Sequence, residues 1–161
     1  MNQTADICDA LEDQVRIAQP LFRDYGGKTV FEGVISTIKC FEDNSLVRDA
    51  VAEPGENRVL VIDGRASKRC ALLGDLLAAK AVENGWQGVI VNGCIRDSAA
   101  IAGLDLGVKA LCTHPRKTVK RGAGQRDITV DFAGEVFQPG MYVYADQDGI
   151  VISDKPISAA I

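Results

Sequence analysis

Three charged residues stand at a spacing that is suited to chemistry on a small acid. Asp75 is followed by twenty residues and then by the pair Arg96-Asp97. The planar guanidinium of Arg96 can donate two parallel hydrogen bonds to the carboxylate and oxo oxygens of an α-oxo acid, and it stays charged while an enolate develops. Asp97 offers a hard oxygen ligand to Mg²⁺ or Mn²⁺. Together these residues predict metal-assisted cleavage of an oxo-acid.

The segment from Gly74 to Leu77 predicts the substrate-binding half of this site. It falls near a predicted helix start, where free backbone N–H groups and the positive end of the helix dipole can hold a carboxylate. Gly74 allows the backbone to come close to a ligand. Asp75 would orient a bound water or move a proton. With Asp97 as the direct protein ligand, water and substrate oxygens would fill most of the metal's other positions, as Mg²⁺ prefers.

Each of these residues also has an ordinary structural explanation. A helix cap or a surface position accounts for Asp75 without any chemistry. An exposed ion pair accounts equally well for Arg96-Asp97. Taken singly, the structural explanation is the more common one, so the prediction depends on whether the fold brings the residues together.

Two short apolar strands and a helix between them would do so. RVLVIDG (58–64) and GVIVNG (88–93) are typical of strands covered on both faces, and an alanine-rich helix is predicted from Leu72 to Asn84, with Gly85 just after its end. This order predicts a βαβ-like unit. Ligands in such units bind beyond the carboxyl ends of the strands, where the loops carrying Asp75 and Arg96-Asp97 would converge.

The rest of the chain predicts a mixed α/β fold with a β-rich core and flanking helices. A helix is expected from Thr4 or Asp6 through about Ala18, ended by Pro20, and a short one near Ala99. Thr29 to Phe41 is expected to be a strand, followed by a turn and the helix SLVRDAVAE. The other expected strands are VKALCTH, DITVDFAG, EVFQPGMYVYAD and GIVIS.

Composition indicates one globular domain spanning residues 1–161, with 47% hydrophobic and 25% charged residues. No apolar run is long enough to cross a bilayer and the first residues lack the pattern of a signal peptide, so a cytoplasmic protein without membrane contact is expected. A net charge of -4 opposes nucleic-acid binding. A small molecule or a protein is therefore the expected partner.

Several other residues have both a functional and a structural interpretation. The five cysteines are scattered and there is one histidine, which opposes both a disulfide framework and a zinc site. Cys94 is better explained as a buried packing group than as a nucleophile, and His114 as a structural residue beside Pro115. The basic cluster is expected to be a solvated loop, with a phosphate, RNA or partner contact as the less common alternative. Its cations are Arg116, Lys117, Lys120 and Arg121.

Several long segments give the chain a resemblance to a known family. The matching segments are GGKTVFEGVISTIKCFEDNSLVRDAV, VLVIDG, Ala71 to Ala79, VNGCIRD and MYVYADQDGIVIS. They resemble the RraA-like family across nearly the whole chain. The resemblance implies a swivelling β/β/α domain that assembles as a homotrimer or as a hexamer formed by two trimers. That family contains regulators of ribonuclease activity A and class II 4-hydroxy-4-methyl-2-oxoglutarate/4-carboxy-4-hydroxy-2-oxoadipate aldolases.

The resemblance is closer to the aldolase branch, whose signature is an acidic residue, twenty residues and then Arg-Asp. It implies that Gly74, Asp75, Leu76 and Leu77 meet the substrate, that Arg96 binds and polarises it with Asp75 as a second catalytic residue, and that Asp97 holds the divalent metal. Some members carry a further acid three positions after that aspartate, where this chain has Ala100.

The activity implied is metal-dependent aldol cleavage. 4-Hydroxy-4-methyl-2-oxoglutarate would give two pyruvates, and 4-carboxy-4-hydroxy-2-oxoadipate would give pyruvate and oxaloacetate. Oxaloacetate decarboxylation is expected as a side activity, because loss of CO₂ generates the same enolate. The alternative is a non-catalytic regulator that inhibits a ribonuclease by protein contact. A third hypothesis is methyltransferase activity, but the sequence has no glycine-rich nucleotide-binding loop to support it.

Overall fold

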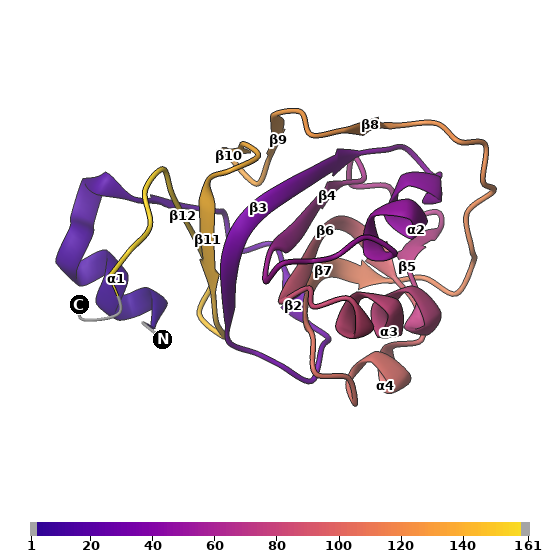
Figure 1. Cartoon of the computed structure of the whole chain (residues 1–161), viewed down its shortest axis with the longest axis horizontal. Helices are drawn as coiled ribbons and strands as arrows, with labels where there is room; N and C mark the ends of the chain where they lie inside the picture. Colours follow the sequence, from indigo (N-terminus) through magenta and orange to yellow (C-terminus); the bar gives the residue numbers. More distant parts are fainter. Residues whose placement is uncertain (1–2, 159–161) are drawn as a thin grey trace.

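A mixed β-sheet with helices packed against it forms the body of the computed structural model, which describes residues 3–158 (Figure 1). The helices are α1 (Thr4–Leu11), the 3₁₀ helix η1 (Glu12–Gln14), α2 (Ser45–Val51), α3 (Asp75–Glu83) and α4 (Ser98–Ile101). Along the sheet, the strands run in the order β1 (Arg16–Ile17), β12 (Ile150–Ser153), β11 (Tyr142–Ala145), β3 (Phe31–Lys39), β4 (Val59–Asp63), β6 (Gly88–Ile95), β7 (Gly107–Thr113) and β2 (Arg23–Asp24). These elements match the mixed α/β fold that the sequence predicts.

Three short pieces complete the β-structure. The strand β5 (Ala71–Leu73) pairs with β6, and β8 (Gln125–Arg126) pairs with β3. A separate antiparallel hairpin consists of β9 (Val130–Phe132) and β10 (Glu135–Phe137). The hairpin lies over one face of the large sheet, and α2 and α3 lie over the other (Figure 1).

The centre of the sheet is parallel and buried on both faces. β3, β4, β6 and β7 are parallel neighbours, and every residue of β4 and β6 is buried. In β4, Leu60 and Ile62 pack in the core under α2 and α3, whereas Val59 and Val61 pack in the core under the hairpin. The continuous apolar runs of the sequence are the consequence of these two covered faces. The predicted βαβ unit of β4, α3 and β6 is therefore confirmed.

Two predicted helices begin or end elsewhere. The first helix stops at Leu11, because Glu12 has a φ of 47° and the chain then becomes extended, pairing Arg16–Ile17 with β12. The predicted helix from Leu72 begins only at Asp75, because the preceding residues form β5 and hydrogen-bond along the edge of β6. No helix in residues 3–158 is long and apolar enough to span a membrane.

Candidate active site

The loops after β5 and β6 converge at the carboxyl end of the parallel sheet. β5 runs parallel to β6, so the chain leaves both strands at the same edge. The N–H of Arg96 donates to the carbonyl of Leu73 at 2.9 Å, and the N–H of Asp75 donates to Oδ2 of Asp97 at 3.1 Å. Two segments about twenty residues apart in the sequence are thus joined by direct hydrogen bonds.

Gly74 is needed here for space. It caps α3 in an extended conformation that any residue can adopt. A Cβ at this position would lie 2.8 Å from Oδ2 of Asp97 and 3.4 Å from Nε of Arg96, so a larger residue would push both side chains away. The sequence predicts that Gly74 allows a ligand to approach the backbone. In the structure, Gly74 allows the carboxylate of Asp97 to approach it.

Asp97 is held in a conformation and a charge state that suit ligand binding. Its φ of 56° is left-handed, which is uncommon for a residue with a side chain and is often found at functional sites. The backbone N–H of Asp75 lowers the pKa of Asp97, and the nearby charge of Arg96 lowers it further. The side chain is 40% exposed. Asp97 therefore presents an ionised carboxylate to the solvent.

Arg96 lies beside this carboxylate but does not hydrogen-bond to it. Its Nε is 3.9 Å from Oδ2 of Asp97, which is beyond hydrogen-bonding distance. The side chain is 39% exposed. The guanidinium can therefore donate hydrogen bonds to a bound anion.

A cavity of about 190 Å³ brings the predicted residues together. All six predicted residues line it, namely Gly74, Asp75, Leu76, Leu77, Arg96 and Asp97. Leu76 lines the cavity with 81% of its surface exposed. A cavity of this size suits a small acid rather than a nucleotide cofactor.

The cavity also has lining residues that the sequence analysis missed. These are Asn44, Arg48, Ala71, Lys117 and Lys120. Four lining side chains are cationic, Arg96 included, against the two carboxylates of Asp75 and Asp97. The arrangement favours a ligand with more than one negative charge. The signal in the sequence was the basic cluster of residues 116–121, which lies far along the chain from the Asp75 and Arg96-Asp97 motif.

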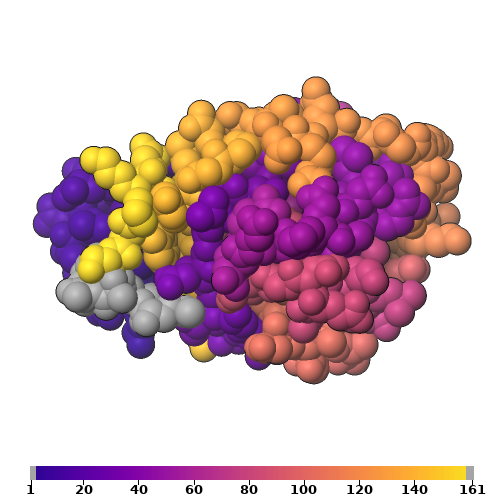
Figure 2. Space-filling model, viewed as in Figure 1, coloured from indigo at the N-terminus to yellow at the C-terminus, as the bar shows by residue number. Residues whose placement is uncertain are grey.

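The segment carrying this cluster is an exposed loop, as the sequence predicts, but its backbone is anchored by hydrogen bonds. The carboxylate of Asp43 accepts the N–H groups of Arg121 at 2.8 Å and Ala123 at 3.0 Å, and Ser45 Oγ accepts that of Gly122 at 3.0 Å. Burial raises the pKa of Asp43, but the hydrogen bonds that its carboxylate accepts from Ser45, Ala123 and Arg121 outweigh burial and lower the pKa to about 2. In Figure 2 the orange segment after β7 follows the edge of the molecule beside the purple segment of α2.

Asn44 connects this segment to β5. Its Oδ1 accepts the hydroxyl of Thr118 at 2.7 Å, and its Nδ2 donates to the carbonyl of Leu72 at 3.1 Å. The N–H of Ala71 donates to the carbonyl of Arg116 at 2.8 Å. Lys117 and Lys120 therefore reach the cavity from a backbone that is fixed on both sides.

A divalent cation fits the donor chemistry near Asp97. Among residues 3–158 there is no group of three or more His, Cys, Asp or Glu side chains that could enclose a metal ion. Asp97 provides an ionised, accessible carboxylate, and Asp75 lines the same cavity. Mg²⁺ is commonly bound by one or two carboxylates and keeps several waters. The site thus fits Mg²⁺ or Mn²⁺ better than a metal that needs a full set of protein ligands.

Three other polar side chains, those of Asp63, Asn92 and His114, have partners within the protein. Asp63 Oδ1 accepts the N–H of Arg65 at 2.9 Å, as in an ordinary turn, and it also accepts Nδ2 of Asn92, its register partner on β6, at 3.0 Å. His114 Nδ1 accepts the N–H of Arg116 at 3.1 Å. The contact of His114 agrees with the structural role that the sequence predicts for it.

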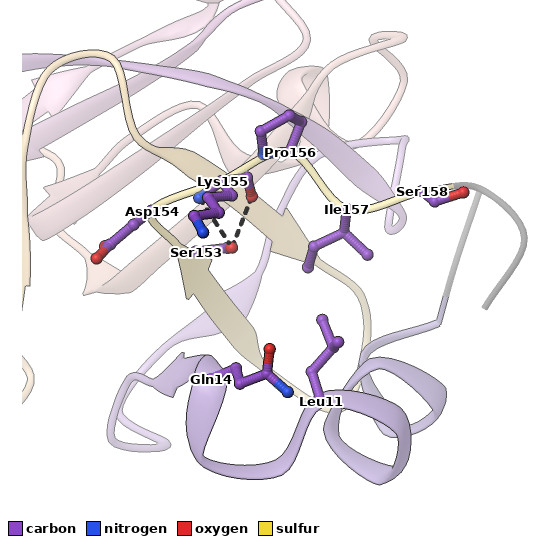
Figure 3. Close-up of a pocket in the computed structure, with 8 residues that line it drawn as sticks. All are labelled: Leu11, Gln14, Ser153, Asp154, Lys155, Pro156, Ile157 and Ser158. Carbon is purple, nitrogen blue, oxygen red and sulfur yellow. Dashed lines mark hydrogen bonds between the residues drawn. The ribbon is translucent and has the colours of Figure 1, made fainter.

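A larger cavity of about 440 Å³ lies at the other end of the sheet, between α1, η1 and the segment after β12 (Figure 3). Leu11 and Ile157 point toward each other across it. Ser153 Oγ donates to the carbonyl of Lys155 at 2.6 Å and accepts its N–H at 3.3 Å. This hydroxyl is used in a turn, and the convergence of charged groups seen near Arg96 does not occur here.

The fold and the cavity define a class: a mixed α/β protein with a cavity lined by four cationic side chains at the carboxyl edge of its parallel strands. The model of the RraA-like family (Aldolase/RraA) matches residues 4–152. The chain therefore belongs to the RraA-like family, as its resemblance predicts.

Individual relatives carry different names. A protein of Alkalilimnicola ehrlichii, provisionally named 4-hydroxy-4-methyl-2-oxoglutarate aldolase, is 59% identical over 157 residues, with 98% of each chain covered. A solved structure described as S-adenosylmethionine:2-dimethylmenaquinone methyltransferase of Geobacillus kaustophilus has a TM-score of 0.93 at 49% identity, with 97% of each chain covered. The structure of the RNA-processing inhibitor RraA of Thermus thermophilis has a TM-score of 0.95 at 37% identity, covering 99% of this chain and 97% of that one.

Proposed function

We propose that this protein is a divalent-metal-dependent aldolase that cleaves 4-hydroxy-4-methyl-2-oxoglutarate into two molecules of pyruvate. The observation that carries the proposal is the convergence of Arg96, Asp97 and the start of α3 around one cationic cavity. The provisional name of the relative at 59% identity supports the same reaction. 4-Carboxy-4-hydroxy-2-oxoadipate is a second substrate of the same chemistry.

Arg96 would bind the pyruvate end of the substrate. Its fork of donors matches the carboxylate and oxo oxygens, and it is not hydrogen-bonded to Asp97. When the bond between C3 and C4 breaks, negative charge moves onto the former oxo oxygen as the enolate forms. A fixed cation at that oxygen stabilises the transition state more than the ground state.

The start of α3 would hold a substrate carboxylate. Gly74 caps a nine-residue helix, and the N–H groups of its first turn are free of helical partners. One of them, that of Asp75, donates to Asp97, and the N–H groups of Leu76 and Leu77, two residues that line the cavity, would bind the anion. Asp75 itself would orient a water or move a proton there.

The basic side of the cavity would take the second carboxylate. Both aldol substrates are multiply charged acids, and Arg48, Lys117 and Lys120 line the cavity together with Arg96. Because the backbone around Thr118 is tied to Asn44, ordering these lysines costs less than it would in a free loop. Binding of a substrate with two carboxylates would account for the four cationic side chains that line this cavity in a small acidic protein.

A cation bound at Asp97 would supply Lewis-acid polarisation of the substrate oxygens. Aldol cleavage needs no further reactant. The C4 hydroxyl gives up its proton, the C3–C4 bond breaks, C4 becomes the ketone of one pyruvate, and protonation of C3 of the enolate gives the second. Oxaloacetate would lose CO₂ to give the same enolate, so decarboxylation is a side activity of the proposed site.

Product analysis tests the proposal. The purified protein is incubated with Mg²⁺ and either 4-hydroxy-4-methyl-2-oxoglutarate or oxaloacetate, and products are identified by proton NMR. We expect pyruvate from both substrates. Absence of pyruvate from the first substrate, with Mg²⁺ and with Mn²⁺, would refute the aldolase assignment even if oxaloacetate were decarboxylated.

Inhibition of a ribonuclease is the second candidate, favoured by the TM-score of 0.95 to the RNA-processing inhibitor RraA. Such an activity needs a protein-binding surface and neither a metal nor Arg96. Inhibition of the RNA-degrading endonuclease is measured at protein concentrations that give clear pyruvate release. We expect little inhibition. Strong inhibition that survives both chelation and Arg96→Ala would support the regulator instead.

A further inference from the structure

Two cysteine thiols meet on the parallel strands that lead into the site. Cys94 on β6 and Cys112 on β7 are partners in register, and their sulfurs lie 2.8 Å apart. Both are free thiols. The sulfur of Cys94 also contacts the carbonyl oxygen of Ser67 at 3.7 Å. The two sulfurs are therefore already in contact before any bond joins them.

A bulge in the sheet creates this pairing. Val91 pairs with Ala110, so regular register would place Gly93 opposite Cys112. The register shifts between Val91 and Cys94, and the extra residue on β6 brings Cys94 opposite Cys112 instead. Bulges re-aim side chains in this way and are common beside active sites. The meeting of the two thiols thus depends on a specific local feature of β6.

We propose that Cys94 and Cys112 form a reversible disulfide when the protein meets a peroxide oxidant. Neighbouring strands lie about 4.8 Å apart, within the range of Cα separations of about 4.4–6.8 Å that disulfides span. The sulfurs need to move less than about 1 Å to reach a bond length of about 2.05 Å. Backbone rearrangement is therefore not required.

The reaction with a peroxide starts at Cys112. The side chain of Cys112 is partly exposed, whereas Cys94 is buried. Burial, with the neighbouring thiol of Cys112, raises the pKa of Cys94 to about 12, so Cys94 is protonated at neutral pH. The thiolate of Cys112 attacks the peroxide oxygen to give a sulfenic acid and one hydroxide, which is protonated to water. The sulfur of Cys94 then displaces the second oxygen, which leaves as water with the Cys94 proton. Two thiols and one hydrogen peroxide thus give one disulfide and two waters.

The disulfide would act on the end of β6 that carries the site. Arg96 follows Cys94 by two residues, and its N–H is bonded to Leu73 on β5. On the other side, the N–H of His114 donates to the carbonyl of Ile95 at 2.9 Å. A covalent link between β6 and β7 at this point would restrict the movement of the strand end that carries Arg96. The effect on activity rests on the proposed function, but the disulfide itself does not.

Peptide mapping tests the bond independently of activity. The folded protein is treated with hydrogen peroxide, free thiols are blocked with N-ethylmaleimide, and the protein is digested with trypsin. Cleavage after Arg96 and Lys109 places Cys94 in peptide 81–96 and Cys112 in peptide 110–116. We expect the two peptides joined, an intact mass lower by about 2 Da, and reversal by dithiothreitol. Sulfinic acid at Cys112, or a link from either thiol to Cys70, would overturn the proposal.

Variants provide the controls. Cys112→Ser and Cys94→Ala should each abolish the 2 Da loss, whereas Cys8→Ser, which changes another partly exposed thiol on α1, should keep it. In the parent, pyruvate release should fall severalfold on oxidation and recover with dithiothreitol, and Cys112→Ser should stay active in peroxide. A 2 Da loss that persists in Cys112→Ser would assign the bond to other cysteines. If the disulfide forms without any loss of activity, its proposed effect on the site is refuted, whereas the proposed disulfide itself is supported.

Discussion

Two aspartates at opposite ends of the sheet differ in how their carboxylates are used. Asp146, after β11, is 5% exposed and accepts the N–H and hydroxyl of Thr4 at 2.8 and 2.7 Å and the N–H of Asp148 at 2.9 Å. Asp97, after β6, is 40% exposed and accepts the N–H of Asp75 at 3.1 Å. A carboxylate whose lone pairs are filled by the protein holds the fold together. A carboxylate that is exposed to solvent beside cationic side chains is available to a ligand.

The surroundings of the two aspartates differ in the same sense. Asp146 fixes α1 to the turn between β11 and β12, beside a small core containing Ile7, Val15 and Val151. Asp97 stands in a left-handed conformation in a cavity with four cations. Changing Asp97 should therefore affect turnover, and changing Asp146 should affect stability. The following predictions test that division.

The largest effect is expected from Asp97→Asn. Asparagine tolerates the left-handed conformation and keeps an oxygen for the N–H of Asp75, but it lacks the charge that a divalent cation requires. Metal-dependent pyruvate release should fall about 10³-fold, because metal polarisation contributes several kcal/mol. The free energy of unfolding should stay within about 0.5 kcal/mol of the parent. Asp131→Asn, on the exposed side of β9, is the matched control. Mg²⁺-stimulated turnover near the parental rate would remove Asp97 from the site.

Asp146→Ala should show the opposite pattern. It leaves the donors of Thr4 without partners, so urea unfolding should show a loss of about 3 kcal/mol. Activity per folded molecule should remain within about twofold. Burial raises the pKa of Asp146, but the bonds from Thr4 outweigh it and lower the pKa overall. The stabilisation is therefore present above the ordinary carboxyl pKa of about 4 and is lost as the pH falls below it, so the difference between parent and variant should shrink at acid pH. A stability gap that widened on acidification would contradict this role.

Arg96→Lys separates the shape of the guanidinium from its charge. A lysine cannot make the planar paired contact, so kcat should fall about 10²-fold and kcat/KM with it, for both aldol cleavage and oxaloacetate decarboxylation. Arg23→Lys, on the exposed β2 edge, should have no effect. A rise in KM alone would mean that Arg96 anchors the substrate without stabilising the enolate.

The smallest effect is expected from Lys120→Ala. An exposed lysine that meets the second carboxylate contributes to binding in the ground and transition states alike, so KM should rise about tenfold with kcat nearly unchanged. Lys155→Ala, on the larger cavity at the other end of the sheet, should leave both constants unchanged. Equal behaviour of the two variants would place the second carboxylate elsewhere in the cavity.

The sequence predicts the parts of the fold whose signal is local. The continuous apolar runs of β4 and β6 and the glycine after α3 mark elements that pack or end as expected. It fails where pairing with a distant strand decides the structure. Ala71–Leu73 has helix-forming residues but extends along β6, and Arg16–Ile17 is drawn into pairing with β12. Tertiary hydrogen bonds outweigh local propensity in both places.

Only part of the candidate site can likewise be predicted from local signals in the sequence. The spacing of Asp75 and Arg96-Asp97 locates one wall of the cavity, because two neighbouring parallel strands carry both motifs to one edge. The other wall comes from Asn44, Arg48 and the segment around Lys117, and this segment is held by hydrogen bonds that it donates to Asp43 and Asn44. The meeting of Cys94 and Cys112 likewise depends on a bulge. Neither contact follows from spacing in the sequence.

The most direct test of the central claim is a titration of pyruvate release by divalent cation. The parent and Asp97→Asn are stripped with a chelator and assayed on 4-hydroxy-4-methyl-2-oxoglutarate while Mg²⁺ is added back, with pyruvate followed by its oxidation of NADH through lactate dehydrogenase. We expect no release from the stripped parent, saturable recovery with Mg²⁺ to two pyruvates per substrate, and no comparable recovery in Asp97→Asn. Full activity of the stripped parent, or equal recovery in the two proteins, would rule out a metal held by Asp97.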